Sequence, residues 1–237
     1  MTNPKHELPE NAVAVLISAN GEWQAVKKRL LPVVLHNSPL GEWFLTDING
    51  VRLIFFHSGW GKTHAAASAQ FVIDTFKPKA VINLGTCGGL VGFAEVGDIF
   101  LVTSTVMYDI FERMGDQSQA SQFYSTRLDT NWLPDDLPAK TRRAPIASAD
   151  QDIDKENFDL LTKEFGVPSA DWESAAIAWV ANRHSTRCLI LRGVSDLISP
   201  THSETDGNNA LWHDRSEQIM EKLLLDLPFY LIYCCQD

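Results

Sequence analysis

Residues Ala80–Gly89 read AVINLGTCGG, an apolar run that ends in a cluster of small residues. Ala80–Leu84 predicts a buried strand, because an apolar run without polar alternation suits a strand that is covered on both faces. Gly85–Gly89 predicts a loop whose backbone N–H groups could contact an anion or a sugar. Taken alone, a glycine cluster after a strand does not identify a ligand.

Short strand-like runs and longer helical runs alternate on both sides of this stretch. The other expected strands are Ala12–Ile17, Glu42–Ile48, Val51–Phe56, Ile99–Thr103, Ala144–Ala147 and Cys188–Val194. The expected helices are Lys62–Phe76, Lys155–Phe165, Glu173–Arg183 and Asn208–Leu227. Asn49 and Gly50 separate two of the strands and are typical of a tight hairpin turn. The alternation elsewhere is typical of crossover units, so the sequence predicts an α/β fold with a largely parallel sheet.

The length of 237 residues suits one large domain, and we expect residues 1–237 to form it. Residues 109–143 are polar and rich in Gln, Ser and Asp, which predicts a mostly irregular surface excursion. A connection of that length is often a lid or a binding loop. The closing stretch Leu227–Cys235 is apolar but contains Pro228, so we expect a packed terminal segment beyond the last helix.

Charge and composition argue against several functional classes. Thirty acidic against 20 basic residues give a net charge of −10, which opposes a broad contact with nucleic acid or an anionic membrane. Residues 1–10 lack the order of an export signal, and no apolar run approaches the roughly 20 residues of a spanning helix. The four cysteines and seven histidines show no metal-ligand spacing. We therefore expect no metal, no cofactor, and reduced thiols in a cytoplasmic protein.

Three acidic residues, Glu22, Glu173 and Asp196, stand where expected strands give way to loops or helices. Ligands of open α/β sheets bind beyond the carboxyl ends of the strands, so each of the three is a candidate site residue. Glu22 follows the first strand and could orient a water molecule. An acid in the first turn of a helix also interacts favourably with the helix dipole, and position alone favours that simpler interpretation.

The other two acids leave their alternatives open. Glu173 follows a candidate N-cap, Asp171, and lies at the N-terminal end of an apolar stripe of the expected helix. Its carboxylate either accepts hydrogen bonds from the vicinal hydroxyls of a ribose or is a polar residue at the boundary of the core. Asp196 follows Arg192 and Ser195 at the end of an apolar strand. It is either a proton donor to a leaving group, which needs a pKa raised by burial, or a turn residue.

Seven blocks of the chain together resemble the purine nucleoside phosphorylase and nucleosidase superfamily, and more narrowly its 5′-methylthioadenosine/S-adenosylhomocysteine nucleosidase branch. The blocks are Ala12–Trp23, Ser58–Lys62, Val81–Gly89, Val96–Asp98, Ser148–Asp150, Trp172–Ala176 and Arg192–Asp196. The most specific part of the resemblance is the segment Glu173–Ala176, followed about twenty residues later by Ser195 and Asp196. The resemblance implies a three-layer α/β/α fold around a central mixed, mostly parallel twisted sheet. It also implies assembly into a homo-oligomer, a dimer or higher.

The resemblance further implies hydrolysis of the N-glycosidic bond of a purine nucleoside. Glu173 is then expected to bind the ribose hydroxyls, Asp196 to protonate the purine at N7, and Glu22 to deprotonate the attacking water. A nearby carboxylate also stabilises an oxocarbenium-like transition state. The other positions that match substrate-contacting segments of the family are Thr86 and Arg192 near the nucleophile, Ser148, Asp150 and Asp152 near the base, Trp172 beside the sugar, and Ser195 next to Asp196.

Two differences favour water over phosphate as the nucleophile. Phosphorylases of this superfamily usually carry an arginine three residues before the Ser or Thr of the glycine loop, where it holds phosphate bidentately. Here that position is Asn83, before Thr86, and the first loop carries Glu22 in place of the Gly-Asp-Pro/Arg pattern. A phosphate-dependent phosphorylase and a catalytically silent nucleoside-binding or storage relative are the alternatives.

Three departures from the nucleosidase pattern leave the base and the 5′ substituent open. The loop Ala19–Glu22 is one residue shorter before its glutamate than the family's Ala-Met-x-x-Glu. Trp172 replaces a methionine before the ribose-binding glutamate and would form a larger wall of the sugar pocket. Asp152 replaces an aromatic residue that often stacks on adenine.

Overall fold

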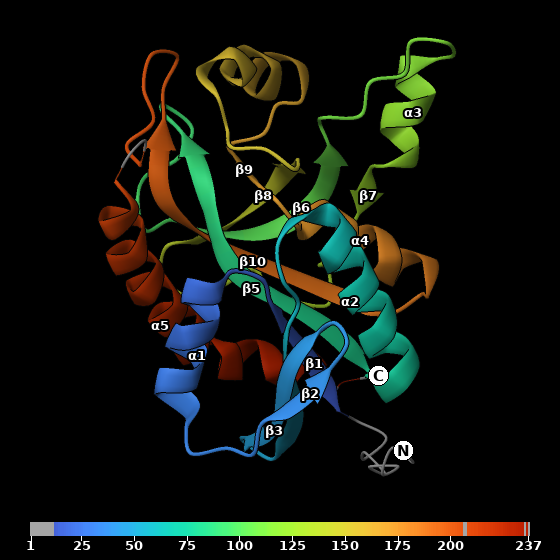
Figure 1. The fold of residues 1–237 in the computed structure, drawn as a ribbon, viewed down its shortest axis with the longest axis vertical. Helices are drawn as coiled ribbons and strands as arrows, with labels where there is room; N and C mark the ends of the chain where they lie inside the picture. The colour runs from blue at the N-terminus through green and yellow to red at the C-terminus, as the bar shows by residue number, and fades with distance from the viewer. Residues whose placement is uncertain (1–11, 206–207, 235, 237) are drawn as a thin grey trace.

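The computed structural model describes residues 12–205, 208–234 and 236, except for the side chain of Lys155 (Figure 1). Residues 1–10 and the thiol of Cys235, both interpreted above, lie outside the described residues. Within the described part no helix is long and apolar enough to cross a membrane.

In the described part of the chain, ten strands form one mixed sheet. The strands are β1 (Val13–Ile17), β2 (His36–Ser38), β3 (Gly41–Ile48), β4 (Val51–His57), β5 (Ala80–Leu90), β6 (Ile99–Met107), β7 (Thr126–Arg127), β8 (Thr141–Ser148), β9 (Ser169–Asp171) and β10 (Arg187–Ile198). β1 is parallel to β4 and β5, and β5 is parallel to β10, so the centre of the sheet is parallel. The predicted hairpin at Asn49 and Gly50 joins the antiparallel strands β3 and β4.

Helices cover both faces of the sheet, which confirms the three-layer prediction. They are α1 (Asn20–Leu30), α2 (Gly61–Phe76), α3 (Gln117–Phe123), α4 (Ser174–Arg183) and α5 (Asn209–Cys234). α1 and α5 lie on one side and α2 and α4 on the other (Figure 1). Alternate residues of β1 enter different cores: Val13 and Val15 pack with Leu223 of α5, whereas Ala14 packs with Ala69 of α2. Side chains of a strand point alternately to its two faces, so one strand supplies both cores.

Part of the sheet closes on itself. β10 pairs with β6, β6 with β8, β8 with β9, β9 with β5, and β5 with β10. The five strands therefore form a closed circuit beside the open part of the sheet. This closure brings β5 and β10 together along eleven paired positions, and the residues at their carboxyl ends become neighbours.

Both central strands are longer than the sequence predicted. Gly85–Gly89 belongs to β5 rather than to a loop, and β10 continues past Val194 to Ile198. Each segment supplies the other with hydrogen-bonding partners, because Gly85–Leu90 pairs with Arg192–Ile198. The predicted loop was wrong because long-range pairing satisfies the backbone of these glycines despite their low strand propensity.

The last helix also runs further than predicted, through Pro228 to Cys234. A proline inside a helix removes one hydrogen bond and costs about 3 kcal/mol. Here Leu227, Tyr230 and Leu231 are buried in the same core as β1, and their 3–4 spacing is kept only if the helix continues. Burial of this stripe offsets the cost of the proline.

Two other predicted segments differ in detail. The helix expected at Lys155–Phe165 is a 3₁₀ turn, η1 (Lys155–Asn157), followed by a π-helical turn, η2 (Leu160–Glu164). The excursion at residues 109–143 is mostly irregular, as predicted, but contains α3, the short strand β7 and the start of β8. Trp179 of α4 donates a hydrogen bond to the carbonyl of Phe123 at 3.0 Å, which holds α3 against α4.

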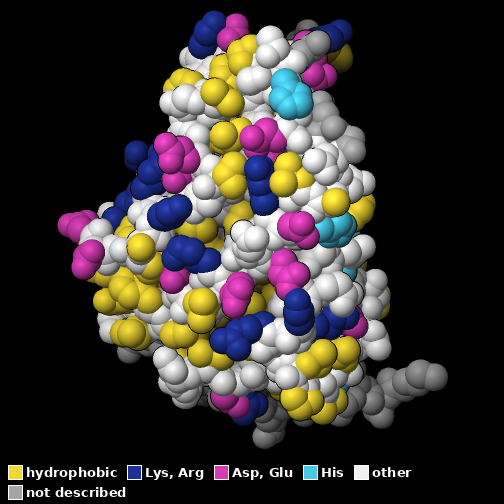
Figure 2. Space-filling model, turned by 90° about the vertical axis from the view of Figure 1, so that its left-hand side faces the viewer, with side chains coloured by type: hydrophobic (Ala, Val, Ile, Leu, Met, Phe, Trp, Pro, Cys, Tyr) yellow, Lys and Arg dark blue, Asp and Glu magenta, His cyan; other side chains and the backbone are white. Residues whose placement is uncertain are grey.

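The face that carries α1 and α5 is turned toward the viewer in Figure 2. Basic and acidic side chains are interspersed on it, with hydrophobic side chains between them. This mixed surface differs from the continuous basic field with which proteins bind nucleic acid.

Candidate active site

A cavity of about 580 Å³ opens where the carboxyl ends of β5 and β10 meet the beginnings of α1 and α4. Eight of the residues that the sequence singled out line it: Glu22, Thr86, Asp152, Trp172, Glu173, Arg192, Ser195 and Asp196. They come from segments far apart in the sequence, and the closed circuit of strands brings them together. The volume lies within the range of small-molecule sites.

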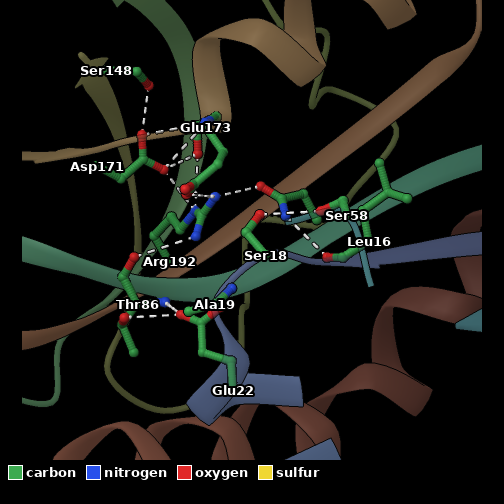
Figure 3. A network of polar contacts seen from close by, with 12 residues as sticks. Leu16, Ser18, Ala19, Glu22, Ser58, Thr86, Ser148, Asp171, Glu173 and Arg192 are labelled. Atoms are coloured by element: carbon green, nitrogen blue, oxygen red, sulfur yellow. Dashed lines mark hydrogen bonds and ion pairs between the residues drawn. The ribbon is translucent and has the colours of Figure 1, made fainter. Parts of the chain in front are cut away.

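Glu22 is buried, with 2% of its surface exposed, so it is not the solvated acid that its position alone favoured. It lies in the first turn of α1 and reaches back to the backbone N–H of Ala19 at 3.1 Å. Its other oxygen accepts two hydrogen bonds from Thr86, from the backbone N–H at 2.6 Å and from the hydroxyl at 2.9 Å. Three donors therefore fix the carboxylate against β5 (Figure 3).

Arg192 is the buried cation of the cavity and holds its two neighbouring acids. Its Nε lies 2.8 Å from Oδ2 of Asp171, and its Nη2 lies 3.6 Å from Oε2 of Glu173. Nη2 also donates to Oδ1 of Asn83 at 2.7 Å, and Nη1 donates to the carbonyl of Thr86 at 3.3 Å. Figure 3 shows the guanidinium between Thr86, Asp171 and Glu173. A buried charge needs this degree of pairing, since desolvation is costly.

Asn83 occupies the position where a phosphorylase would carry arginine, and both ends of its amide are used inside the protein. Its amide nitrogen donates to the carbonyl of Leu16 at 3.0 Å, and its oxygen accepts from Arg192. Asn83 is fully buried and does not line the cavity. It therefore acts as a support for Arg192.

Glu173 stands at the N-cap position of α4, two residues after the end of β9. Its Oε1 accepts a hydrogen bond from the backbone N–H of Gly61 at 3.1 Å. Burial raises the pKa of Glu173 to about 8, although Arg192 opposes the shift. Asp171 was predicted as the N-cap, but it lies two residues before that position; its carboxylate accepts from the backbone N–H of Ser174, the first residue of the helix, at 3.2 Å.

Asp196 lies within β10 at an irregularity in the strand. Val194 pairs with Cys87 and Asp196 with Gly88, so Ser195 is the extra residue of a β-bulge. Bulges often redirect side chains beside functional sites. One oxygen of Asp196 accepts from the hydroxyl of Ser195 at 2.6 Å and the other from Thr205 at 3.1 Å. Burial raises the pKa of the Asp196 carboxyl, as a proton donor requires.

Two of the residues singled out from the sequence lie behind the cavity wall. Ser148 is fully buried; it donates to Asp171 and accepts from the backbone N–H of Ala175 at 3.0 Å. Asp150 is exposed and accepts from the backbone N–H of Lys62 at 2.6 Å. In the described structure neither side chain lines the cavity: Ser148 supports Asp171, which does, whereas Asp150 contacts Lys62 outside it.

Several residues that complete the cavity carry no signal in the sequence. Thr205 and Trp212 follow the last strand, and Ile153 and Ile198 flank Gly88. Trp60 stands in a block that carried the family resemblance, but no role was assigned to it. Across the described residues no group of three or more His, Cys, Asp or Glu side chains is arranged to hold a metal ion.

Comparison with known proteins agrees with this arrangement. The model of the phosphorylase superfamily matches residues 13–225. The chain is 30% identical over 197 residues to the 5′-methylthioadenosine/S-adenosylhomocysteine nucleosidase of Buchnera aphidicola subsp. Acyrthosiphon pisum, which covers 78% of this chain and 84% of that protein. It is 28% identical over 188 residues to the protein of the same name from Maridesulfovibrio salexigens, covering 74% and 77%.

Among solved structures, the 5′-methylthioadenosine/S-adenosylhomocysteine nucleosidase of S. pneumoniae with a transition-state inhibitor superposes with a TM-score of 0.76. It is 18% identical and covers 94% of this chain and 99% of its own, so it shows a shared fold. The family model spans every strand and all the acids of the cavity described above. This chain belongs to the phosphorylase superfamily, and within it is similar to the 5′-methylthioadenosine/S-adenosylhomocysteine nucleosidases.

Proposed function

We propose that the protein hydrolyses the N-glycosidic bond of a purine nucleoside related to 5′-methylthioadenosine or S-adenosylhomocysteine, releasing the base and a ribose derivative. One observation carries the proposal: three acids, Glu22, Glu173 and Asp196, line one cavity of about 580 Å³. Their surroundings differ, and each surrounding suits one of the three tasks that this reaction needs. The names of the relatives support the same activity.

Asp196 is the group that we propose as the acid. The bond breaks more easily if N7 of the leaving purine is protonated, because the base then departs neutral. Burial raises the pKa of Asp196 and so favours a carboxyl that can donate. Beside it, a Cβ on Gly88 would lie 2.6 Å from Cδ1 of Ile198 and 2.7 Å from Cδ1 of Ile153. The isoleucines thus pack closely against Gly88, and their side chains give this part of the cavity an apolar lining that suits a flat base.

Glu22 is the proposed base for the attacking water. It accepts three hydrogen bonds, two of them from backbone N–H groups that can only donate, and these bonds orient the carboxylate. Water attacks the anomeric carbon as the bond to the base lengthens, and its proton passes to Glu22. A carboxylate in this place also stabilises the positive charge that develops on the sugar.

Glu173 is proposed to bind the ribose. A carboxylate oxygen has two acceptor directions, so Oε1 can hold Gly61 and still meet a hydroxyl group. The vicinal hydroxyls of a ribose would replace the water that Glu173 loses on burial. This role explains why a carboxyl group stands at the N-terminus of α4, whose other residues are mostly buried.

The charges of the cavity support water rather than phosphate as the nucleophile. Arg192 is the only cation among the described residues that line the cavity, and its donors are engaged by Asp171, Asn83 and Thr86. A phosphate ion would therefore meet carboxylates without a free guanidinium to bind it. The reaction as proposed uses no cofactor and no metal.

The purified protein should be incubated with a panel of purine nucleosides, including 5′-methylthioadenosine, with and without inorganic phosphate, and base release followed by chromatography. We expect base release without phosphate, together with a free sugar. Release only in the presence of phosphate, with formation of a sugar 1-phosphate, would establish a phosphorylase. Binding without release from any nucleoside would favour a silent relative.

Three further features of the protein are part of the proposal. We propose a single domain over residues 1–237, supported by one sheet whose strands span Val13 to Ile198.

We propose a homo-oligomer, a dimer or higher, supported by the exposure of Phe111 and Met114 and tested by light scattering after gel filtration. A cytoplasmic location is supported by the buried free thiols of Cys87 and Cys188.

A further inference from the structure

Three tryptophans, Trp60, Trp172 and Trp212, line the same cavity as the three acids. Trp60 is 62% exposed, although large aromatic side chains are usually well buried. Trp172 and Trp212 are half-buried. Aromatic side chains that remain open to a cavity offer their π faces to a ligand.

The tryptophans are linked to the groups that would hold the sugar. Trp60 and Trp172 immediately precede Gly61 and Glu173, the two partners of the hydrogen bond at the proposed ribose-binding carboxyl. The ring of Trp212 covers the start of α1, with its Cζ3 atom 3.1 Å from where a Cβ of Gly21 would lie, next to Glu22. The proposed place for the base, in contrast, is built from Gly88, Ile153 and Ile198. The aromatic walls therefore belong to the sugar side of the cavity, where a 5′ substituent would extend.

The cavity carries an excess of negative charge. Five carboxyl side chains line it, from Glu22, Asp152, Asp171, Glu173 and Asp196, against the single guanidinium of Arg192. Even with Glu173 and Asp196 protonated and Asp171 paired with Arg192 at 2.8 Å, the carboxylates of Glu22 and Asp152 remain without a cation in the described lining. Arg192 is 1% exposed and engaged by its buried partners, so it offers little compensation to a ligand. The potential in the cavity therefore favours a cation and disfavours an anion.

Building on the proposed function, we propose that the tryptophan-lined side of the cavity selects nucleosides whose 5′ substituent carries a positive charge, such as a sulfonium or an alkylammonium group. A cation over an indole face is attracted by the ring quadrupole, and the attraction grows as the cation is desolvated. The surrounding carboxylates add to it. A 5′-phosphate would be repelled by the same carboxylates and finds no free basic side chain in the described lining.

The test compares two substrates of almost the same shape and different charge. They are 5′-dimethylsulfonio-5′-deoxyadenosine, which is a cation, and 5′-isopropyl-5′-deoxyadenosine, which is neutral. We expect kcat/KM to be about tenfold higher for the sulfonium compound, a factor within the range of a desolvated cation–π contact. Adenosine 5′-phosphate should be the poorest of the three substrates.

Substitutions of single tryptophans test whether the aromatic walls cause the preference for the sulfonium compound. Trp60→Leu removes an exposed ring and should fold, and it should bring the ratio of the two kcat/KM values close to one. Trp212→Leu should act in the same direction. Trp132→Leu removes a half-buried tryptophan outside the cavity, and its ratio should equal that of the wild type.

The outcomes separate the two proposals. If both nucleosides are hydrolysed at equal rates, or if the ratio survives Trp60→Leu and Trp212→Leu, the charge preference is wrong and the nucleosidase proposal stands. If neither is hydrolysed and 5′-methylthioadenosine and the other purine nucleosides of the panel are not hydrolysed either, the nucleosidase proposal fails. Calorimetric titration with the same two compounds then decides the charge preference: tighter binding of the sulfonium compound that Trp60→Leu abolishes supports it, and equal binding overturns it.

Discussion

The hydroxyl of Thr205 lies 3.1 Å from Oδ2 of Asp196 and donates a hydrogen bond to it, although the two residues belong to different segments. Thr205 stands in the connection between β10 and α5. The adjacent Glu204 fastens this connection to the strand by accepting from the backbone N–H of Leu197 at 3.1 Å and from Arg215 at 2.7 Å. The proposed acid is thus held from outside its own strand.

Thr205→Val should move the alkaline limb of the pH profile of kcat/KM to higher pH. Burial raises the pKa of Asp196, and the hydrogen bond from Thr205 lowers it. Removing that hydrogen bond therefore raises the pKa further. The protonated carboxyl that we propose as the acid then persists to higher pH. Thr201→Val, which alters an exposed threonine of the same connection, should leave the profile unchanged. A shift to lower pH in Thr205→Val would contradict the assignment of the acid.

Asp196→Asn should lower kcat by roughly 10²–10⁴-fold, the usual contribution of a general acid. An amide retains the size of the side chain but cannot protonate N7. The loss should be small for a substrate whose leaving group needs no protonation, such as a nitrophenyl riboside. Equal turnover of 5′-methylthioadenosine by wild type and variant would exclude Asp196 as the acid.

Glu173→Gln should change how stability depends on pH. The pKa of Glu173 is about 8 in the folded protein, whereas the ordinary pKa of a glutamate is 4.5, so between these values the folded state binds more protons than the unfolded state. Stability contributed by this group is therefore complete below pH 4.5 and is lost as pH rises toward 8, with a slope of at most about 1.4 kcal/mol per pH unit. The free energy of unfolding, measured in urea from pH 5 to 8, should fall less steeply in Glu173→Gln. A variant with the same slope as wild type would refute the raised pKa.

Glu173→Gln should also reveal the ribose contact. The variant should lose activity mainly on substrates that keep both ribose hydroxyls, because the amide replaces one side-chain oxygen with an N–H donor, which cannot accept a hydrogen bond from a hydroxyl. The comparison is the ratio of kcat/KM for a ribonucleoside and its 2′-deoxy analogue, in wild type and variant. The same fractional loss on both substrates would argue against ribose recognition.

Gly85→Ala should destabilise the protein by about 1–3 kcal/mol and reduce its activity. A Cβ at this position would collide with Nη1 of Arg192 and lie 3.0 Å from Oε1 of Glu22, and both side chains are buried and fixed by hydrogen bonds. Gly115→Ala, whose nearest neighbour would be 3.5 Å away, is the matched control. Thermal unfolding of the two variants measures the difference, and equal melting temperatures would be inconsistent with the crowding at Gly85.

The sequence by itself determined the fold class and most of the candidate site. Buried strands such as β1 are apolar throughout, and the turn at Asn49 and Gly50 is a local preference, so both can be read from neighbouring residues. The resemblance to the nucleosidases singled out Glu22, Glu173 and Asp196, and the structure places all three in one cavity. These features were predictable because they depend on local patterns or on a motif in the family's order.

The tertiary structure decided what depends on distant partners. Gly85–Gly89 became part of a strand because β10 pairs with it, and α5 continued through Pro228 because its apolar stripe packs in the core. Asn83 looked from the sequence like a missing phosphate ligand, and only the fold shows that it supports Arg192. Hydrogen bonding, burial and pKa are properties of a residue's surroundings in space. No stretch of sequence contains those surroundings until the chain has folded.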